Sequence, residues 1–207
     1  MFKRISLFLL GALLAGTALA AAPDEALKAS VDQFRGMIRE HRAEYTADRA
    51  KYYQAVEQVV VPRFDVMYIA QLVLGQNWRT ATPEQRTRFA NAFKNMLVHA
   101  YANEMLENND SVSVDWQPVR MAPNADSAQV GSVLKRNDGR MVTVGFRLRQ
   151  ANNDWKIFDI VIENISLVTN FRTQLNSEIK RTSLDDVIAR MEKGEFQSQA
   201  PKSGTPS

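Results

Sequence analysis

The chain has 207 residues, of which 45% are hydrophobic and 24% are charged, a composition typical of a globular domain and not of a largely disordered chain. The formal net charge is only +3, which argues against nucleic acid as a partner. Because there is no cysteine, disulfide bonds and thiolate chemistry are excluded, and a hydrophobic core must supply the stability.

The first residues have the pattern of a secretory signal peptide. Lys3 and Arg4 precede an apolar run over 5–14, and residues 18–20 are Ala-Leu-Ala, a small-x-small site that signal peptidase accepts. An uncleaved membrane anchor is the less favoured alternative, because this run is shorter than the roughly 20 residues that span a bilayer. We therefore predict a signal peptide over 1–22, cleavage, and an exported mature chain.

The apolar residues of the N-terminal half recur at helical spacing. They predict two amphipathic helices between Pro23 and Pro62, and then a short apolar helix over 64–74 that Gly75 ends.

The clearest helix start in the chain is at Thr82. Pro83 suits the first helical position, and Gln85 can complete a capping box with the Thr82 side chain. The long helix that follows is expected to run to the Asn108-Asn109 pair. Its predicted buried stripe consists of Phe89, Phe93, Met96, Leu97, Ala100 and Tyr101.

After residue 110 the hydrophobic period changes from helical to two, which predicts four antiparallel strands. Asn137-Asp138-Gly139 and Asn152-Asn153 are the expected turns on either side of the third strand. That strand is strongly one-sided, with a predicted apolar face of Val142, Val144, Phe146 and Leu148. The fourth strand, 155–162, has bulky residues on both faces and is expected to be more buried.

Two further helices are predicted, over 166–181 and 183–193, and the polar segment 194–207 is expected to form a disordered tail. The fold class is therefore α+β, with N-terminal helices, a four-stranded antiparallel sheet and C-terminal helices in one domain, 23–193.

The motifs of common enzymes are absent from the sequence. There is no GxGxxG, P-loop or GxSxG motif and no pair of histidines at metal spacing, so we predict no catalytic residue, metal ligand or cofactor. Asp159 and Glu163 are four residues apart near a strand end and could in principle divide acid and base roles. Solvation, or a bond to a neighbouring helix terminus, is the favoured interpretation of both.

Trp78-Arg79 could face a headgroup or a partner protein, but packing of the indole over a helix end is favoured.

Two stretches, Gln76–Arg86 and Trp155–Gln174, resemble the toluene-tolerance (MlaC) family of periplasmic phospholipid-binding proteins. The resemblance extends over residues 24–193. This chain departs from the family pattern at Asn164, where Gly is expected, and at Phe171, where Tyr is usual. Neither position has an assigned chemical role in the family.

The resemblance implies a periplasmic phospholipid carrier that maintains the lipid asymmetry of the outer membrane. It also implies two partners, an outer-membrane lipoprotein–porin complex and an inner-membrane ABC transporter complex with its lipid-binding subunit. A carrier that must detach from both is expected to be a monomer. Bound phospholipid would be cargo, with its acyl chains in an apolar cavity between the sheet and the helices.

Hydrophobic periodicity, combined with the architecture that the resemblance implies, predicts residues that contact the acyl tails. They are Phe93, Leu97, Tyr101, Val142, Val144, Phe146, Leu148, Phe158 and Ile160.

Two other functions stay open at this point, because apolar positions line a packed core and a ligand cavity equally well. One is an enzyme that uses the same pocket, which a buried acid or base with a shifted pKa would favour. The other is an adaptor whose apolar groove binds a partner helix or strand, which a pocket too small for two acyl chains would favour.

Overall fold

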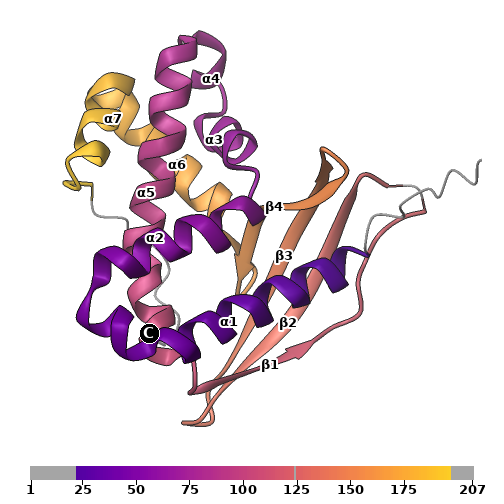
Figure 1. Ribbon diagram of the computed structural model, residues 1–207. Coiled ribbons are helices and arrows are strands. Elements are labelled where there is room, and N and C mark those ends of the chain that lie inside the picture. Colours follow the sequence, from indigo (N-terminus) through magenta and orange to yellow (C-terminus); the bar gives the residue numbers. More distant parts are fainter. Residues whose placement is uncertain (1–21, 124, 197–207) are drawn as a thin grey trace, which may run out of the picture.

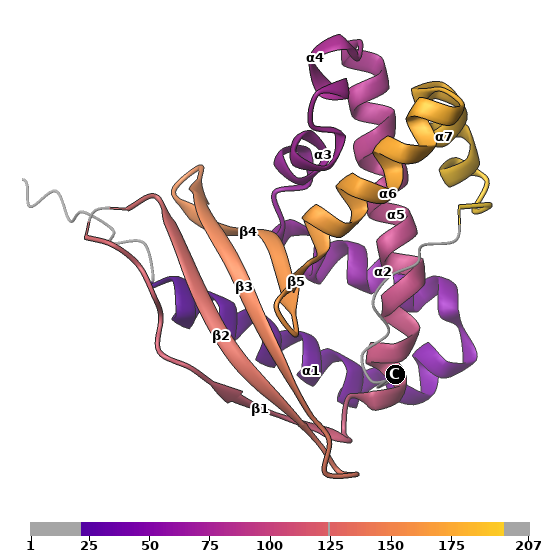
Figure 2. The same ribbon diagram turned by 180° about the vertical axis from the view of Figure 1, so that it is seen from behind.

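The computed structural model describes residues 22–123 and 125–196. Helices come first in the chain, antiparallel strands follow, and two helices close the domain (Figures 1 and 2). The predicted α+β order is confirmed. The predicted signal peptide and tail lie outside the described residues except at their inner ends.

The helix boundaries of the N-terminal half follow local capping signals. Thr82 and Gln85 form the predicted capping box, Asp65 accepts a hydrogen bond from the backbone N–H of Tyr68, and Gly75 ends the short apolar helix with a φ of 56°. These helices are α1 (Pro23–Ala47), α2 (Arg49–Val59), the 3₁₀ helix η1 (Val61–Arg63), α3 (Val66–Leu74), α4 (Asn77–Thr80) and α5 (Pro83–Asn108).

The antiparallel sheet has five strands in chain order, not the four that the sequence predicted. They are β1 (Val112–Trp116), β2 (Ser127–Arg136), β3 (Met141–Ala151), β4 (Asp154–Ile162) and β5 (Ile165–Ser166). The missed strand exists because Glu163 and Asn164 both have positive φ, 48° and 66°, which makes a tight two-residue turn that returns the chain along β4. Asn tolerates this conformation, so the turn forms without the glycine of the family pattern.

Helices α6 (Leu167–Arg181) and α7 (Leu184–Glu192) complete the domain. Ser166 caps α6 and Ser183 caps α7, each through a side-chain oxygen that accepts a hydrogen bond from a backbone N–H of the first turn.

Three hydrophobic cores hold these elements together. The helical core joins α3, α5, α6 and α7 and includes Phe89, Phe93, Phe171, Leu175 and Ile188. The sheet core joins α1 to the sheet and consists of Leu27, Ala128, Val130, Leu148, Trp155 and Ile157. The tyrosine core joins α1, α2 and the C-terminal half of α5 and consists of Ile38, Tyr45, Tyr52, Val56, Ala102 and Leu106.

Helix α5 does not bury the single stripe that the sequence predicted. Its N-terminal half places Phe89 and Phe93 in the helical core, whereas its C-terminal half places Ala102 and Leu106 in the tyrosine core. The buried face therefore changes along the helix, and Ala100, predicted to be buried, is exposed.

Candidate functional site

The register of the sheet assembles a continuous apolar face. Directly paired residues of neighbouring strands place their side chains on the same side of a sheet. The pairings give four rows across the strands: Val114, Leu134 and Val142; Trp116, Ser132, Val144 and Ile162; Val130, Phe146 and Ile160; Ala128, Leu148 and Ile157.

Helix α1 runs across the sheet (Figure 1), and its core contacts lie in two of these rows. Leu27 and Val31 of α1 pack in the sheet core, where Phe146 and Ile160 lie at the margin of the buried group. A pocket of about 10 Å³ beside Leu27 and Leu148 has room for roughly one water molecule. The burial of Leu27, Val130, Leu148 and Ile157 makes this half of the face structural core.

The apolar residues of the other two rows, apart from Trp116, form what we call the distal face: Val114, Leu134, Val142, Val144 and Ile162. Trp116 packs instead against the sheet core, with its ring centroid 6.0 Å from that of Phe146. None of these five side chains belongs to the three cores that the described residues form. Val144 is nevertheless only 6% exposed, and the other four are half-buried. The one polar side chain in these rows, Ser132, is buried and donates its Oγ–H to the carbonyl oxygen of Val144 at 3.1 Å. The distal face is thus a partly to fully buried apolar face, and its single polar side chain is already hydrogen-bonded.

Two predicted residues of α5 lie with other helices. Phe93 stacks on Phe89 with the ring centroids 5.7 Å apart and meets the ring of Phe171 edge-on at 5.2 Å. Leu97 packs at the margin of the same helical core.

Tyr101, also on α5, belongs to none of the three cores formed by the described residues. Its hydroxyl oxygen is buried and has no hydrogen-bond partner in that part of the chain.

Phe158 is set apart from the apolar face by a β-bulge. Arg147 pairs with Asp159 while Leu148 pairs with Ile157, so Phe158 has no partner on β3. Its ring instead meets that of Tyr68 on α3 edge-on, with the centroids 5.6 Å apart.

The nine predicted tail-contacting residues thus lie in different surroundings, and their role stays a prediction. Val142 and Val144 lie on the distal face, while Phe146, Leu148 and Ile160 lie under α1. The prediction omitted Val114, Leu134 and Ile162 of the distal face. The period-two alternation of β1 and β2 could have identified the first two once the strand register was known.

Asp159 is a buried carboxylate that holds α6 to the sheet. Its Oδ2 accepts hydrogen bonds from Arg147 Nη1 at 3.0 Å and from Ser166 Oγ at 2.7 Å, and its Oδ1 accepts from the backbone N–H of Val168 at 3.1 Å. A carboxylate at a helix N-terminus is favoured by the unpaired N–H groups and by the helix dipole. The expected bond to a neighbouring helix terminus is confirmed, and all three donors engage this carboxylate in structural contacts.

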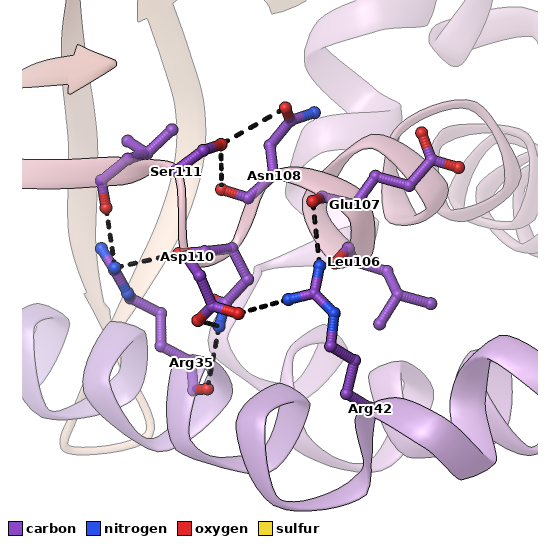
Figure 3. A network of polar contacts seen from close by, with 9 residues as sticks. Arg35, Arg42, Leu106, Glu107, Asn108, Asp110 and Ser111 are labelled. Atoms are coloured by element: carbon purple, nitrogen blue, oxygen red, sulfur yellow. Dashed lines mark hydrogen bonds and ion pairs between the residues drawn. The ribbon is translucent and has the colours of Figure 1, made fainter. Parts of the chain in front are cut away.

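Two arginines of α1 fix that helix to the end of α5 (Figure 3). Arg35 Nη2 donates to the carbonyl oxygens of Asn109 and Val112 at 3.0 and 2.7 Å, and Asn109 Nδ2 donates in return to the carbonyl oxygen of Arg35 at 3.3 Å. Arg42 donates hydrogen bonds to three further residues at the end of α5, namely Leu106, Glu107 and Asp110. Carbonyl groups at the end of a helix lack partners within the helix, so these contacts both complete α5 and hold α1 across the sheet.

In the described part of the chain, no three His, Cys, Asp or Glu side chains gather closely enough to hold a metal ion. No helix in that part is long and apolar enough to cross a membrane.

The sequence model of the MlaC protein family matches residues 28–193. The chain belongs to the MlaC protein family. The match begins within α1 and ends just after α7, so it includes every strand and, apart from Leu27, every core residue named above. The family resemblance predicted from the two sequence stretches is confirmed.

Individual MlaC-family relatives match over most of their length. The toluene tolerance protein ttg2D of Pseudomonas putida is 28% identical over 185 residues, which is 88% of this chain and 85% of that protein. The intermembrane phospholipid transport system binding protein MlaC of Haemophilus influenzae is 20% identical over 200 residues, 95% of this chain and 93% of the relative. A phospholipid-binding protein from Ralstonia solanacearum, solved in complex with a phospholipid, is 28% identical with a TM-score of 0.77. That similarity covers 84% of this chain and 97% of the solved chain.

Proposed function

We propose that this protein is a periplasmic phospholipid carrier that holds acyl chains between the distal face and the helices and catalyses no reaction. The similarity to the Ralstonia solanacearum protein, which was solved with a bound phospholipid, is the observation that carries this proposal. The distal face supports it independently, because five apolar side chains lie outside the packed cores of the described residues on a face whose single polar side chain is already hydrogen-bonded.

The physical chemistry of the cargo requires a shield of this kind. Two acyl chains have about 30 methylene groups, and at about 0.8 kcal/mol for each, the gross cost of exposing them to water is about 24 kcal/mol. Free diffusion of single lipids through water is therefore negligible. Release into bulk water would face most of the same cost, so we expect release only while the carrier is docked on a partner.

The distal face also suggests what the carrier would select. Val142 and Val144 offer only methyl groups, and the Ser132 hydroxyl is already bonded, so this face would contact tails and not headgroups. We therefore expect weak selectivity among headgroups and a cavity without metal or cofactor.

The direction and partners of transport are a finer part of the proposal. The Haemophilus influenzae relative is named as the binding protein of an intermembrane phospholipid transport system. By this relationship we propose that the chain shuttles phospholipid between an outer-membrane lipoprotein–porin complex and an inner-membrane ABC transporter complex with its lipid-binding subunit. It would thereby maintain outer-membrane lipid asymmetry and work as a monomer.

The proposal is tested by offering lipid to the delipidated mature protein. The protein is incubated with vesicles of isotope-labelled phosphatidylethanolamine and phosphatidylglycerol and re-isolated, and its lipids are extracted and identified. We expect intact diacyl phospholipid at close to one molecule for each protein chain. Labelled lysophospholipid or fatty acid would instead indicate an enzyme. Protein that stays empty would indicate an adaptor that uses the apolar face for a protein partner.

A further inference from the structure

The hydroxyl of Tyr101 is an unusual group for its position. Its oxygen is buried, yet it has no hydrogen-bond partner among the described residues. Buried polar groups in folded proteins are nearly always paired, since an unpaired donor loses its bonds to water without replacement. This hydroxyl therefore calls for a partner that the described chain does not provide.

Tyr52 of the tyrosine core shows what a structural tyrosine in this fold looks like. It is fully buried, and its hydroxyl donates to the carbonyl oxygen of Ala102 at 2.8 Å. Tyr101 immediately precedes Ala102 on α5 but lies in no core of the described residues. The hydroxyl of Tyr52 therefore has an acceptor within the protein, whereas that of Tyr101 has none among the described residues.

The position of Tyr101 fits a ligand that is mostly apolar. It lies between Leu97, one turn earlier, which packs at the margin of the helical core, and Ala102, which packs in the tyrosine core. Met105, one turn later on the same side of α5, is 46% exposed. A hydroxyl in these surroundings could meet the boundary between the acyl tails and the glycerol of a bound lipid.

The negative charge of Glu104 near Tyr101 favours a neutral ester oxygen of such a lipid over a charged phosphate oxygen. Burial, and then the negative charge of Glu104, raise the pKa of Tyr101, so the phenol stays protonated and can donate a hydrogen bond. A phosphate would carry its charge into a buried position close to this carboxylate, which is unfavourable. An ester carbonyl oxygen is neutral and accepts hydrogen bonds without donating any. It is therefore a suitable hydrogen-bond acceptor for the buried hydroxyl of Tyr101.

We propose that Tyr101 Oη donates a hydrogen bond to an ester carbonyl oxygen of the bound glycerophospholipid, and so makes the carrier selective for ester-linked over ether-linked lipids. This inference rests on the proposed carrier function and adds a residue that recognises the linkage of the chains, not the headgroup.

The test is a competition between two lipids that differ only in this linkage. Delipidated protein is incubated with vesicles of diacyl and dialkyl-ether phosphatidylglycerol in equal amounts and with chains of equal length. The bound lipids are then extracted and quantified by mass spectrometry against isotope-labelled standards. One hydrogen bond corresponds to about a threefold to tenfold preference for the ester lipid in the wild-type protein. In Tyr101→Phe we expect the two lipids to be bound in nearly equal amounts.

Tyr52→Phe is the matched control, because it removes a hydroxyl that already has a protein acceptor. We expect it to lower stability and to keep the wild-type ratio of ester to ether lipid. Equal binding by the wild type, or an unchanged preference in Tyr101→Phe, would overturn the assignment of Tyr101 and leave the carrier function standing. Uptake of neither lipid by the folded wild type would overturn the carrier function, and this inference with it.

Discussion

Val144 occupies the centre of the distal face, paired with Ser132 on one side and Ile162 on the other. In Val144→Asp, we expect the carboxylate to be incompatible with acyl tails, because an unpaired charge is costly to remove from water. Lipid recovered with the folded variant should fall at least roughly tenfold below the wild-type amount, as measured by extraction and mass spectrometry.

Gln129→Asp is the control for this substitution. Gln129 is exposed on the neighbouring strand and pairs with Arg147, so a carboxylate at this position stays in water beside a positive charge. Its lipid content should match that of the wild type. Normal lipid content in folded Val144→Asp would mean that the tails do not lie on the distal face.

A substitution of Asp159 tests whether this single side chain holds α6 to the sheet. In Asp159→Asn the side chain loses its charge and one acceptor oxygen, while Ser166 and the N–H of Val168 still require acceptors. We expect the free energy of unfolding to fall by about 1–3 kcal/mol, measured by urea denaturation. Asp115→Asn, which alters an exposed ion pair with Lys135, should change it by less than about 0.5 kcal/mol. Equal effects of the two changes would contradict a structural role for Asp159.

Among the elements, the position of α1 depends on its hydrogen bonds to the C-terminal end of α5 and the start of β1. Arg35→Ala removes the donor to the carbonyl oxygens of Asn109 and Val112, which are at the end of α5 and the start of β1. We expect a loss of about 1–2 kcal/mol in the free energy of unfolding and faster amide hydrogen exchange in α1.

Arg39 provides the comparison on the same helix. It is exposed, and the structure shows no hydrogen bond or ion pair for it with the described residues. Arg39→Ala should therefore leave both the unfolding free energy and the exchange rates of α1 nearly unchanged. If it destabilises the protein as much as Arg35→Ala does, the hydrogen bonds of Arg35 are not what holds α1 in place.

Elements with local signals could be predicted from the sequence. The capping box of Thr82 and Gln85 and the turn at Asn152-Asn153 each depend on neighbouring residues, and both form as expected. Strand β5 was missed because Glu163-Asn164 is not a typical turn sequence. The change of buried face along α5 was missed because it depends on helices distant in the sequence.

The candidate site was predictable only in part for the same reason. The alternation within β3 identified Val142 and Val144, but it could not separate them from Leu148, which α1 covers. Phe158 was placed with the inward residues because a β-bulge leaves no clear trace in the hydrophobic pattern. The role of Tyr101 depends on a missing acceptor, which only three-dimensional contacts can show.

At the scale of the whole molecule, the described chain builds three separate cores around a sheet whose apolar face is only partly used by them. A domain that served only as a scaffold would gain stability by packing the remaining apolar side chains against its own helices. The arrangement is accounted for if the distal face is completed by lipid. Apolar surface of the protein and of the cargo then leave water together.

The most direct test of this account is native mass spectrometry of the mature protein, purified from periplasm without detergent, followed by solvent extraction of its lipid. We expect a mass that exceeds the mature chain by one diacyl phospholipid in most molecules, with a mixture of headgroups that follows the membrane composition. A mass equal to that of the chain alone in every preparation, from protein that also takes up no lipid from vesicles, would contradict the carrier function.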